Sequence, residues 1–302
     1  MSAVEWEKCG LIVKPQKRLW WMQTHAMLPT IDKLDGSLHR IYFSGRDEEN
    51  RSYVGYVIID VDRPDKVIEY GADPVLAPGE LGCFDDCGVT PSSIVNHGGK
   101  KYMYYIGWKK RSSVRMGLVG GLAVSHDGGK SFERLSRAPL LKTTDAEPYS
   151  ILTAPYVLVE NGLWRMWYVS GVVWVNPDLP RYNIKYAESR DGIHWDRNGT
   201  VCIDLKSETE NALARPCVIR DGNLYKMWFA YKGEDYRIGY AESLDGVKWH
   251  RKDEQVGIDV SEFGWNSEMI EYAFIFTYNN KKHMLYNGNN YGFDGIGLAI
   301  EK

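Results

Sequence analysis

The residues best suited to chemistry are carboxylates that recur shortly before β-rich segments of the chain, most of which begin with proline. Asp86, Glu147, Glu210 and Glu268 hold such places in four successive parts of the sequence. Carboxylates brought together repel one another and raise one another's pKa, so one of them can carry the proton that general acid–base chemistry requires. The other interpretation is that surface connections are commonly charged. It is weaker for acids that recur at the same place in four units.

A second group of residues is suited to holding an anion. Arginine forms planar, bidentate hydrogen bonds to phosphate or carboxylate, and several arginines stand in the connections that follow aromatic strands. These residues favour a substrate that carries negative charge. The predicted substrate contacts are His25, Arg46, Asp47, Arg51, Trp108, Glu210, Arg215, Arg237, Tyr272 and Asn289.

An internal repeat indicates which elements must position these side chains. Residues 182–198 read YNIKYAESRDGIHWDRN, residues 236–252 read YRIGYAESLDGVKWHRK, and a third copy at 121–135 reads GLAVSHDGGKSFERL. Asp-Gly between two β-rich runs is a strong hairpin signal. We therefore predict that the aspartates of these hairpins are turn residues and that their tryptophans pack between units; they are Asp127, Asp191, Asp245, Trp195 and Trp249.

Upstream of each hairpin lies another pair of strands. The inner strand begins with proline or alanine and apolar residues, and an aromatic strand follows it. The inner strands recur about every 60 residues, as PTI at 29–31, PSSIV at 91–95, PYVLV at 155–159, PCVI at 216–219 and AFIF at 273–276. Four short antiparallel strands repeated five times predict an all-β, five-bladed β-propeller that occupies residues 1–302 as one domain.

The two ends of the chain predict how the ring closes. The fifth unit stops at GIGLAIEK, after its third strand, so its outer strand is missing. The N-terminus repeats the outer-strand pattern of Trp195, Arg197, Gly199 and Val201 with Trp6, Lys8, Gly10 and Ile12. We predict that the N-terminal strand completes the last blade, which also protects the sheet edges.

Chain direction predicts which connections share a face. The connection into each inner strand and the one between the second and third strands lie where the channel opens, and the Asp-Gly hairpins lie on the other face. Side chains alternate along a strand. On that basis Asp86 and Glu268, five places before the proline position, are predicted to point into the channel with Arg215 and Tyr272, and His25 to lie at its mouth.

The five-unit pattern with S-x-DG-x-x-W hairpins resembles the five-bladed propeller glycosidases over essentially the whole chain. These are the arabinosidase/xylosidase, invertase/levanase and mannoside-phosphorylase families. The resemblance implies sugar rings stacked on aromatic residues in a central pocket and carboxylates that cleave a glycosidic bond. Those families often place an acid immediately before the proline of the inner strand. Here the positions hold Leu28, Thr90, Ala154, Arg215 and Tyr272.

We therefore expect a carbohydrate-active enzyme, a hydrolase or a phosphorylase-like protein, that acts at a glycosidic bond of an anionic or phosphorylated sugar. Asp86 is the predicted general acid, and Glu268 or Glu147 is the partner base. One protein carboxylate suffices in the phosphorylase family, because inorganic phosphate replaces water as the attacking group. The alternatives are a non-catalytic sugar-binding propeller in glycan assembly and a transferase or lyase on the same scaffold.

Composition narrows the class of partner. The 302 residues include 37 Lys and Arg against 40 Asp and Glu, a formal net charge of -3 that argues against nucleic acid or an anionic membrane as the main partner. The sequence has no apolar run long enough to span a bilayer, and MSAVEWEKCG lacks the features of a signal peptide. Five scattered cysteines predict neither a disulfide framework nor a zinc site. We expect no metal, no cofactor and a cytoplasmic location.

Overall fold

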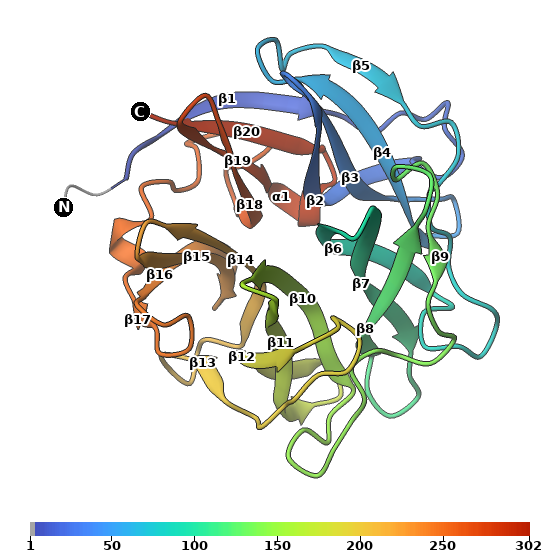
Figure 1. Ribbon diagram of the computed structural model, residues 1–302, viewed down its shortest axis with the longest axis vertical. Helices are drawn as coiled ribbons and strands as arrows, with labels where there is room; N and C mark the ends of the chain where they lie inside the picture. The colour runs from blue at the N-terminus through green and yellow to red at the C-terminus, as the bar shows by residue number, and fades with distance from the viewer. Residues whose placement is uncertain (1–3) are drawn as a thin grey trace.

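The computed structural model describes residues 4–302, which form five blades of four antiparallel strands each around a central axis (Figure 1). Blade 1 contains β2 (Thr24–Asp35), β3 (Leu38–Arg46), β4 (Ser52–Asp60) and β5 (Val67–Tyr70). Blade 2 contains β6 (Gly88–His97), β7 (Lys100–Lys110), β8 (Met116–Ser125) and β9 (Glu133–Arg134). Blade 3 contains β10 (Ile151–Glu160), β11 (Leu163–Asn176), β12 (Leu179–Ser189) and β13 (Val201–Ile203).

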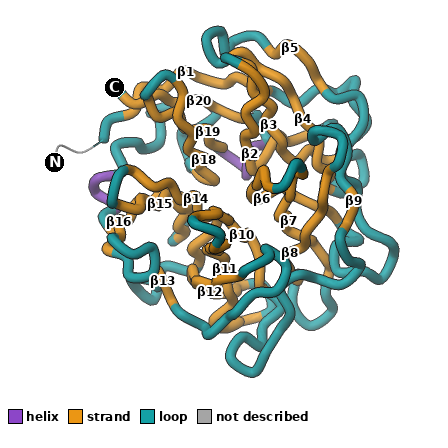
Figure 2. The backbone as a smooth tube through the Cα atoms, viewed as in Figure 1, coloured by secondary structure: helices purple, strands orange, loops and turns teal. Residues whose placement is uncertain are grey.

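Blade 4 contains β14 (Ala212–Asp221), β15 (Leu224–Lys232), β16 (Tyr236–Ser243) and β17 (His250–Arg251). Blade 5 contains β18 (Glu271–Tyr278), β19 (Lys281–Asn287), β20 (Ile296–Glu301) and β1 (Trp6–Val13). The inner strands β2, β6, β10, β14 and β18 surround the opening, with loops at the periphery (Figure 2). The described helices, η1 (Asp253–Gln255) and α1 (Asn289–Gly292), are both too short to cross a membrane.

Ring closure occurs as predicted. Strand β1 pairs antiparallel with β20, with Trp6 opposite Glu301 and Val13 opposite Ile296. The indole of Trp6 lies edge-on to Trp228 of blade 4, with ring centroids 6.3 Å apart, and donates a hydrogen bond to the Val256 carbonyl at 2.9 Å. The N-terminal strand therefore belongs to the last sheet and also packs against its neighbour. The fold is an all-β, five-bladed propeller, as the sequence predicts.

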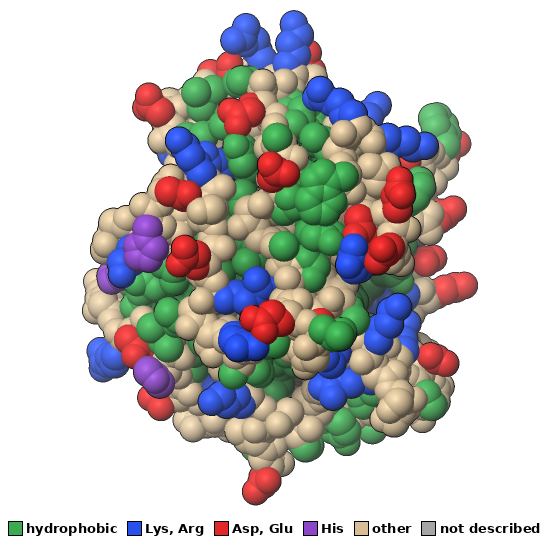
Figure 3. All heavy atoms as spheres, turned by 90° about the vertical axis from the view of Figure 1, so that its right-hand side faces the viewer, with side chains coloured by type: hydrophobic (Ala, Val, Ile, Leu, Met, Phe, Trp, Pro, Cys, Tyr) green, Lys and Arg blue, Asp and Glu red, His purple; other side chains and the backbone are tan. Residues whose placement is uncertain are grey.

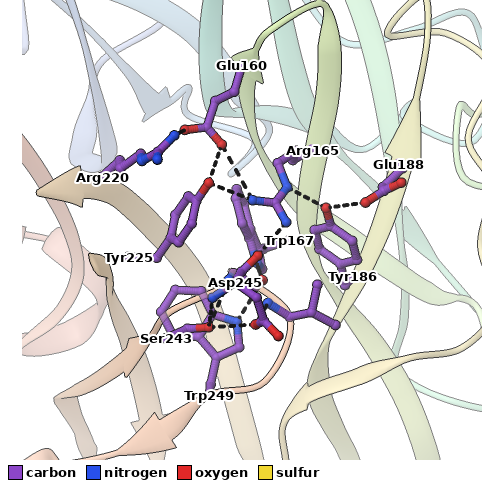
Figure 4. Close-up of polar contacts among 12 residues, drawn as sticks. Glu160, Arg165, Trp167, Tyr186, Glu188, Arg220, Tyr225, Ser243, Asp245 and Trp249 are labelled. Atoms are coloured by element: carbon purple, nitrogen blue, oxygen red, sulfur yellow. Dashed lines mark hydrogen bonds and ion pairs between the residues drawn. The ribbon is translucent and has the colours of Figure 1, made fainter. Parts of the chain in front are cut away.

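The Asp-Gly hairpins are turns that also join adjacent blades. The Asp245 carboxylate accepts the backbone N–H groups of Val247 and Lys248, each at 2.8 Å, which confirms its predicted turn role. The Gly246 carbonyl accepts indole N–H groups from Trp249, at 3.0 Å, and from Trp167 of the preceding blade, at 2.7 Å (Figure 4). Each turn thus holds the second strand of the blade before it.

The same contact recurs around the ring and stops where the ring closes. Gly192 accepts a hydrogen bond from the Tyr104 hydroxyl at 2.9 Å, and Gly129 accepts one from Tyr42 at 2.8 Å. Trp228 holds the equivalent place in blade 4, and its buried indole N–H has no hydrogen-bond partner among residues 4–302. The reason is that blade 5 takes its outer strand from the N-terminus, so no Asp-Gly hairpin joins its third strand to its fourth and accepts this N–H.

Arg165 strengthens the joint between blades 3 and 4. Its guanidinium donates hydrogen bonds to the hydroxyls of Tyr186 and Tyr225 at 2.5 and 2.7 Å (Figure 4). A further bond reaches the Asp245 carbonyl at 2.5 Å. Blades are therefore held together by polar contacts at their outer turns as well as by the aromatic core between them, where Trp21, Trp167 and Trp228 are fully buried.

Candidate binding site in the central channel

A repeated backbone irregularity brings one residue of most inner strands to the channel. Leu28, Ala154, Arg215 and Tyr272 have φ values of 53°, 47°, 49° and 56°, and each directly precedes the proline or alanine that marks the strand. The pairing register shifts at these places, as in a β-bulge. A left-handed backbone at a residue other than glycine costs free energy and is concentrated at functional sites. All four residues line the central cavity.

The cavity has a volume of about 450 Å³ and opens on the face that chain direction predicts. The connections between second and third strands contribute Arg115, Asp178, Gly233 and Tyr291 to its wall. Much of the remaining lining is apolar and is built from the inner strands and from the ends of the strands beside them. Its residues include Met27, Ile106, Leu118, Ile151, Val169, Ala212 and Ala214.

Four cations line this cavity. None of Arg46, Arg115, Arg215 and Lys232 forms an ion pair with a carboxylate of the described residues. Asp178 is the one acidic residue among the described residues that line the wall, and its side chain is exposed. On the side of the molecule shown in Figure 3, by contrast, basic and acidic side chains are interspersed. The cavity lining is thus predominantly cationic, whereas the face shown in Figure 3 carries both signs of charge.

Arg215 lines the cavity with only 1% of its surface exposed. It donates hydrogen bonds to the Pro29 carbonyl at 2.7 Å and the Thr30 hydroxyl at 2.8 Å, and approaches the Pro91 carbonyl at 3.4 Å. Its Nε has no partner among the described residues. Burial lowers the pKa of Arg215 to about 10, which leaves the guanidinium charged at neutral pH. Arg215, a predicted substrate contact, thus connects blade 4 to blades 1 and 2 across the centre of the ring.

His25, predicted to lie at the mouth of the channel, is not among the residues that line the cavity and is an uncharged ring near Arg46. It is buried, with the Phe293 ring edge-on at 5.3 Å and the Thr24 hydroxyl 2.9 Å from Nδ1. Burial and the charge of Arg46 lower the pKa of His25 to about 4. At neutral pH this imidazole has one nitrogen that donates and one that accepts a hydrogen bond, and it brings no positive charge to a ligand.

The recurring acids of the sequence have a structural reason that the sequence did not reveal. In blades 2, 3 and 4 an acid before the inner strand, which in blade 2 is Asp85 and not the predicted Asp86, pairs with an arginine on the outer side of the same blade. The pairs are Asp85 with Arg134 at 2.8 Å, Glu147 with Arg197 at 2.9 Å and Glu210 with Arg251 at 2.6 Å. These intrablade ion pairs lock the connection to its own sheet, and none of the three acids lines the cavity.

The structure does not bring the predicted catalytic acids together in the channel. Asp86 is held by Lys109 at 2.8 Å; burial would raise the pKa of its carboxyl, but the hydrogen bonds from Lys109 and the Gly82 N–H hold it below its usual value. Glu268 is exposed, and Glu147 is buried in its ion pair. The alternation rule does not apply to these residues, because β6 begins at Gly88 and β18 at Glu271, after the acids in question.

The predicted substrate contacts divide into two groups. Arg46, Trp108, Arg215 and Tyr272 line the cavity. The others lie outside its lining and are engaged elsewhere. Asp47 and Arg51 pair with each other at 2.9 Å across the β3–β4 turn. Arg237 contacts Asp259 at 3.3 Å, and the Asn289 side chain accepts the Glu268 N–H at 2.9 Å.

Sequence reasoning missed two tyrosines of the site. Tyr182 and Tyr236 line the cavity, and their hydroxyls lie 3.1 Å apart. Both occupy the first position of the repeated YNIKYAES and YRIGYAES segments, a signal that could have identified them. Lys232 lines the wall beside them, with its ammonium 3.2 Å from the Tyr291 hydroxyl. Glu271, adjacent to Tyr272, is completely buried.

Within residues 4–302, no three His, Cys, Asp or Glu side chains are grouped in a way that could hold a metal ion. All five cysteines are free. The polar side chains that line the cavity are its arginines, Lys232, its tyrosines, Thr153, Asn211 and the exposed Asp178.

Comparison with known proteins places this protein among close sequence relatives. It is 42% identical over 296 residues to the uncharacterized proteins MT1551 and Rv1502, from two strains of Mycobacterium tuberculosis, and the match covers 98% of this sequence and 98% of each relative. This protein belongs to their family. No family model matches the sequence.

Comparison with solved structures shows the fold. One glycoside hydrolase has a TM-score of 0.74 at 18% identity, with 100% of this protein and 92% of the other covered. A thermostable family-43 glycoside hydrolase gives 0.66 at 15% identity, with coverage of 92% and 89%. A mutant of the Bombyx mori GH32 beta-fructofuranosidase BmSUC1, in complex with sucrose, gives 0.66 at 13% identity, with coverage of 95% and 63%. The family thus has a glycoside-hydrolase-like propeller fold, and at least one protein of this fold binds a sugar.

Proposed function

We propose that this protein binds an anionic sugar in its central channel and acts at a glycosidic bond of that ligand. The charge of the cavity carries the proposal. Four cations line it without a carboxylate partner among the described residues, against one exposed acid. Arginine in a partly dry cavity favours a phosphate or carboxylate group, and positive charge there raises the local concentration of anions.

The size and aromatic lining of the cavity support a sugar as the carrier of that charge. A volume of about 450 Å³ lies within the range of roughly 300–1,000 Å³ that small-molecule sites occupy. Trp108, Tyr272 and Tyr291 line the cavity, and the Trp108 indole is fixed by a hydrogen bond to the Thr90 hydroxyl at 2.9 Å. The glycoside hydrolases that share the fold are consistent with this class of ligand.

The mechanism of bond cleavage is a separate part of the proposal. Hydrolysis by two carboxylates needs both of them beside the scissile bond. The roles predicted for Asp86, Glu268 and Glu147 stay predictions, and their positions outside the cavity lining do not support them. A phosphorolytic reaction suits the charge better, because cations would hold the attacking phosphate and a single protein acid would serve the leaving oxygen.

A specific observation favours a second candidate function. None of the three predicted catalytic acids lies among the described residues that line the cavity. A propeller that binds an anionic sugar without turning it over needs the cations and the aromatic walls but no such acid. This second candidate, a sugar-binding protein for glycan assembly, shares the ligand of the first one and differs only in turnover.

Binding is tested by calorimetric titration with glucose 6-phosphate, glucuronate and uncharged glucose. We expect the two anions to bind and glucose to bind far more weakly. Arg46→Gln removes a cation from the wall and should weaken anion binding by about 10- to 100-fold, the usual effect of losing a charge-assisted hydrogen bond. Arg51→Gln is the matched control, because Arg51 is exposed and paired with Asp47. Equal affinity for glucose and its phosphate would contradict the proposal.

Turnover is tested with aryl glycosides in the presence and absence of inorganic phosphate. Release of the aryl group only with phosphate supports the phosphorolytic reaction, and release without it supports hydrolysis. Equal rates for the wild type and Asp86→Asn would remove Asp86 from the role of general acid. Tight binding without turnover of any substrate would support the second candidate. A cytoplasmic location remains part of the proposal.

A further inference from the structure

Glu271 is the most unusual ionisable group in the molecule. It begins β18 and has no exposed surface. Both of its carboxyl oxygens lack a hydrogen-bond partner among residues 4–302. Nearly all buried polar groups in proteins have such a partner, so an unpartnered carboxyl needs an explanation.

The neighbours of Glu271 connect it to the cavity. Its partner across the β18–β19 ladder is Asn287, whose amide is fully used by the Leu28 N–H and by the Ala26 and Gly295 carbonyls, at 2.8–2.9 Å. The groups within electrostatic range of the Glu271 carboxyl come from β12, β15, β16 and β18. They are Tyr182, Lys232, Tyr236 and Tyr272, and all four line the cavity.

Burial determines the charge state of this carboxyl. An ionised carboxylate without a hydrogen bond is very costly in a dry interior, so the group keeps its proton. Burial raises the pKa of Glu271 well above its usual value, and the charge of Lys232 and the nearby Tyr272 hydroxyl oppose this only in part. Burial also raises the pKa of Tyr182, Tyr236 and Tyr272, so these phenols are neutral. Lys232 is thus the charged group that acts on Glu271.

Lys232 is placed to serve either Glu271 or a ligand. Its ammonium lies over the rings of Tyr236 and Tyr291, 5.3 and 5.6 Å from their centroids. It has no ion pair with a described carboxylate, and it lines the cavity with Arg46 and Arg115. A neutral Glu271 leaves this charge available to an anion in the cavity. An ionised Glu271 would attract Lys232 and repel the anion.

We propose that Glu271 is a positioning residue that controls the binding of anionic ligands in the channel through its effect on Lys232. The inference rests on the proposed function, since it assumes an anionic ligand in this cavity. Glu271 is not among the residues that line the cavity, so it acts by charge and not by contact. Linkage makes the effect reciprocal, so a bound anion favours the protonated form of Glu271. Ionisation of Glu271 in turn lowers the affinity for the anion by up to about tenfold per pH unit.

The test is a titration with glucose 6-sulfate, whose charge stays constant between about pH 5 and about pH 9. We expect the affinity of the wild-type protein to fall as the pH rises through the range in which Glu271 loses its proton. Glu271→Gln keeps the shape but cannot ionise, so its affinity should change much less with pH. Glu268→Gln is the matched control. It removes an exposed acid three residues away and should keep the wild-type profile.

A second variant keeps the proposal falsifiable if Glu271→Gln does not fold. Lys232→Gln should weaken binding and also flatten the pH profile, because the group through which Glu271 acts is gone. Identical pH slopes in the wild type and Glu271→Gln, or an unchanged slope in Lys232→Gln, would overturn the inference while leaving the anion site intact. No binding of glucose 6-sulfate to the wild type at any pH would instead overturn the proposed function, and this inference with it.

Discussion

Ionisable side chains in the cavity wall and close to it are buried without a partner of opposite charge. Arg215 bonds only to neutral carbonyl and hydroxyl groups, Glu271 has no bonded partner among the described residues, and His25 is held next to the cation of Arg46. Ion pairs would neutralise the channel and make it indifferent to charge. Their absence among these residues leaves a positive field that a ligand can satisfy, and the desolvation costs are borne by the rest of the fold.

The ionisation of His25 gives a prediction at the residue scale. Its folded-state pKa, about 4, lies below the ordinary value of 6.5, so the native state binds fewer protons than the unfolded state at pH values between these two. Stability should therefore be lost as the pH falls from about 6.5 through about 4, by up to roughly 3 kcal/mol. His25→Gln should lose less stability over this range, as measured by urea unfolding at a series of pH values. His126→Gln, at an exposed imidazole, is the control. Parallel curves for wild type and His25→Gln would contradict the prediction.

At the scale of elements, the connections into the inner strands of blades 2 to 5 are tied to their own blades. The Glu147 carboxylate shows how completely this is done, since it contacts Arg197 at 2.9 Å, Lys185 at 3.4 Å and the hydroxyls of Tyr168 and Ser170 at 2.9 and 2.8 Å. In blade 5 an amide takes the place of the acid, with Asn266 donating to the Tyr286 hydroxyl. These contacts fix where each of these inner strands begins relative to its own blade. They therefore also fix the position of the bulges that line the cavity.

Removing this buried charge should cost far more than removing an exposed one. Glu147→Gln leaves Arg197 and Lys185 buried without their counter-charge, so we expect the free energy of unfolding to fall by about 3 kcal/mol. Glu208→Gln breaks the ion pair with Arg181, but the Glu208 side chain is 95% exposed, and the change should stay within about 0.5 kcal/mol. Urea unfolding of both variants checks this. A stable Glu147→Gln protein that had lost only turnover would restore Glu147 to a catalytic role.

At the scale of the whole molecule, the ring is held by a joint between the two ends of the chain. Strand β1 contributes six register pairs to β20, and Trp6 fills the space against Trp228. Because blade 5 has no Asp-Gly hairpin after its third strand, this strand takes over the joining that those hairpins perform between blades 1 to 4. The channel depends on it, since blade 5 supplies Tyr272 and Tyr291 to the cavity wall.

Trp6→Ala tests the joint. Trp6 is 6% exposed, and its loss should lower the free energy of unfolding by about 3–5 kcal/mol, the usual cost of removing a buried tryptophan. Trp20→Ala, which removes the same side chain at an exposed place, is the control. Trp20 is 50% exposed and lies edge-on to Tyr53, so its loss should lower the free energy of unfolding by about 1 kcal/mol or less. Thermal and urea unfolding decide between them. Equal effects of the two variants would show that the closing strand adds little to the stability of the ring.

The site could be predicted from the sequence only in part. Arg46, Trp108, Arg215 and Tyr272 lie in or close to elements that the repeat identifies, and the structure places them in the cavity. Asp86 and Glu147 recur with the same regularity but serve their own blades. The repeat shows that a residue type is required at a position. It does not show whether a ligand or a neighbouring arginine requires it.

The sequence by itself determined the number of blades, the closing strand and the hairpin turns, because these depend on local patterns that repeat at a fixed spacing. Only the tertiary structure decided which charges remain free in the channel. A carboxylate is neutralised by whichever cation the fold brings within reach, as Arg197 is brought to Glu147 across 50 residues. Glu271 keeps its proton because the packed blades exclude both water and a hydrogen-bond partner among the described residues. Such distances and such burial exist only once the ring has closed.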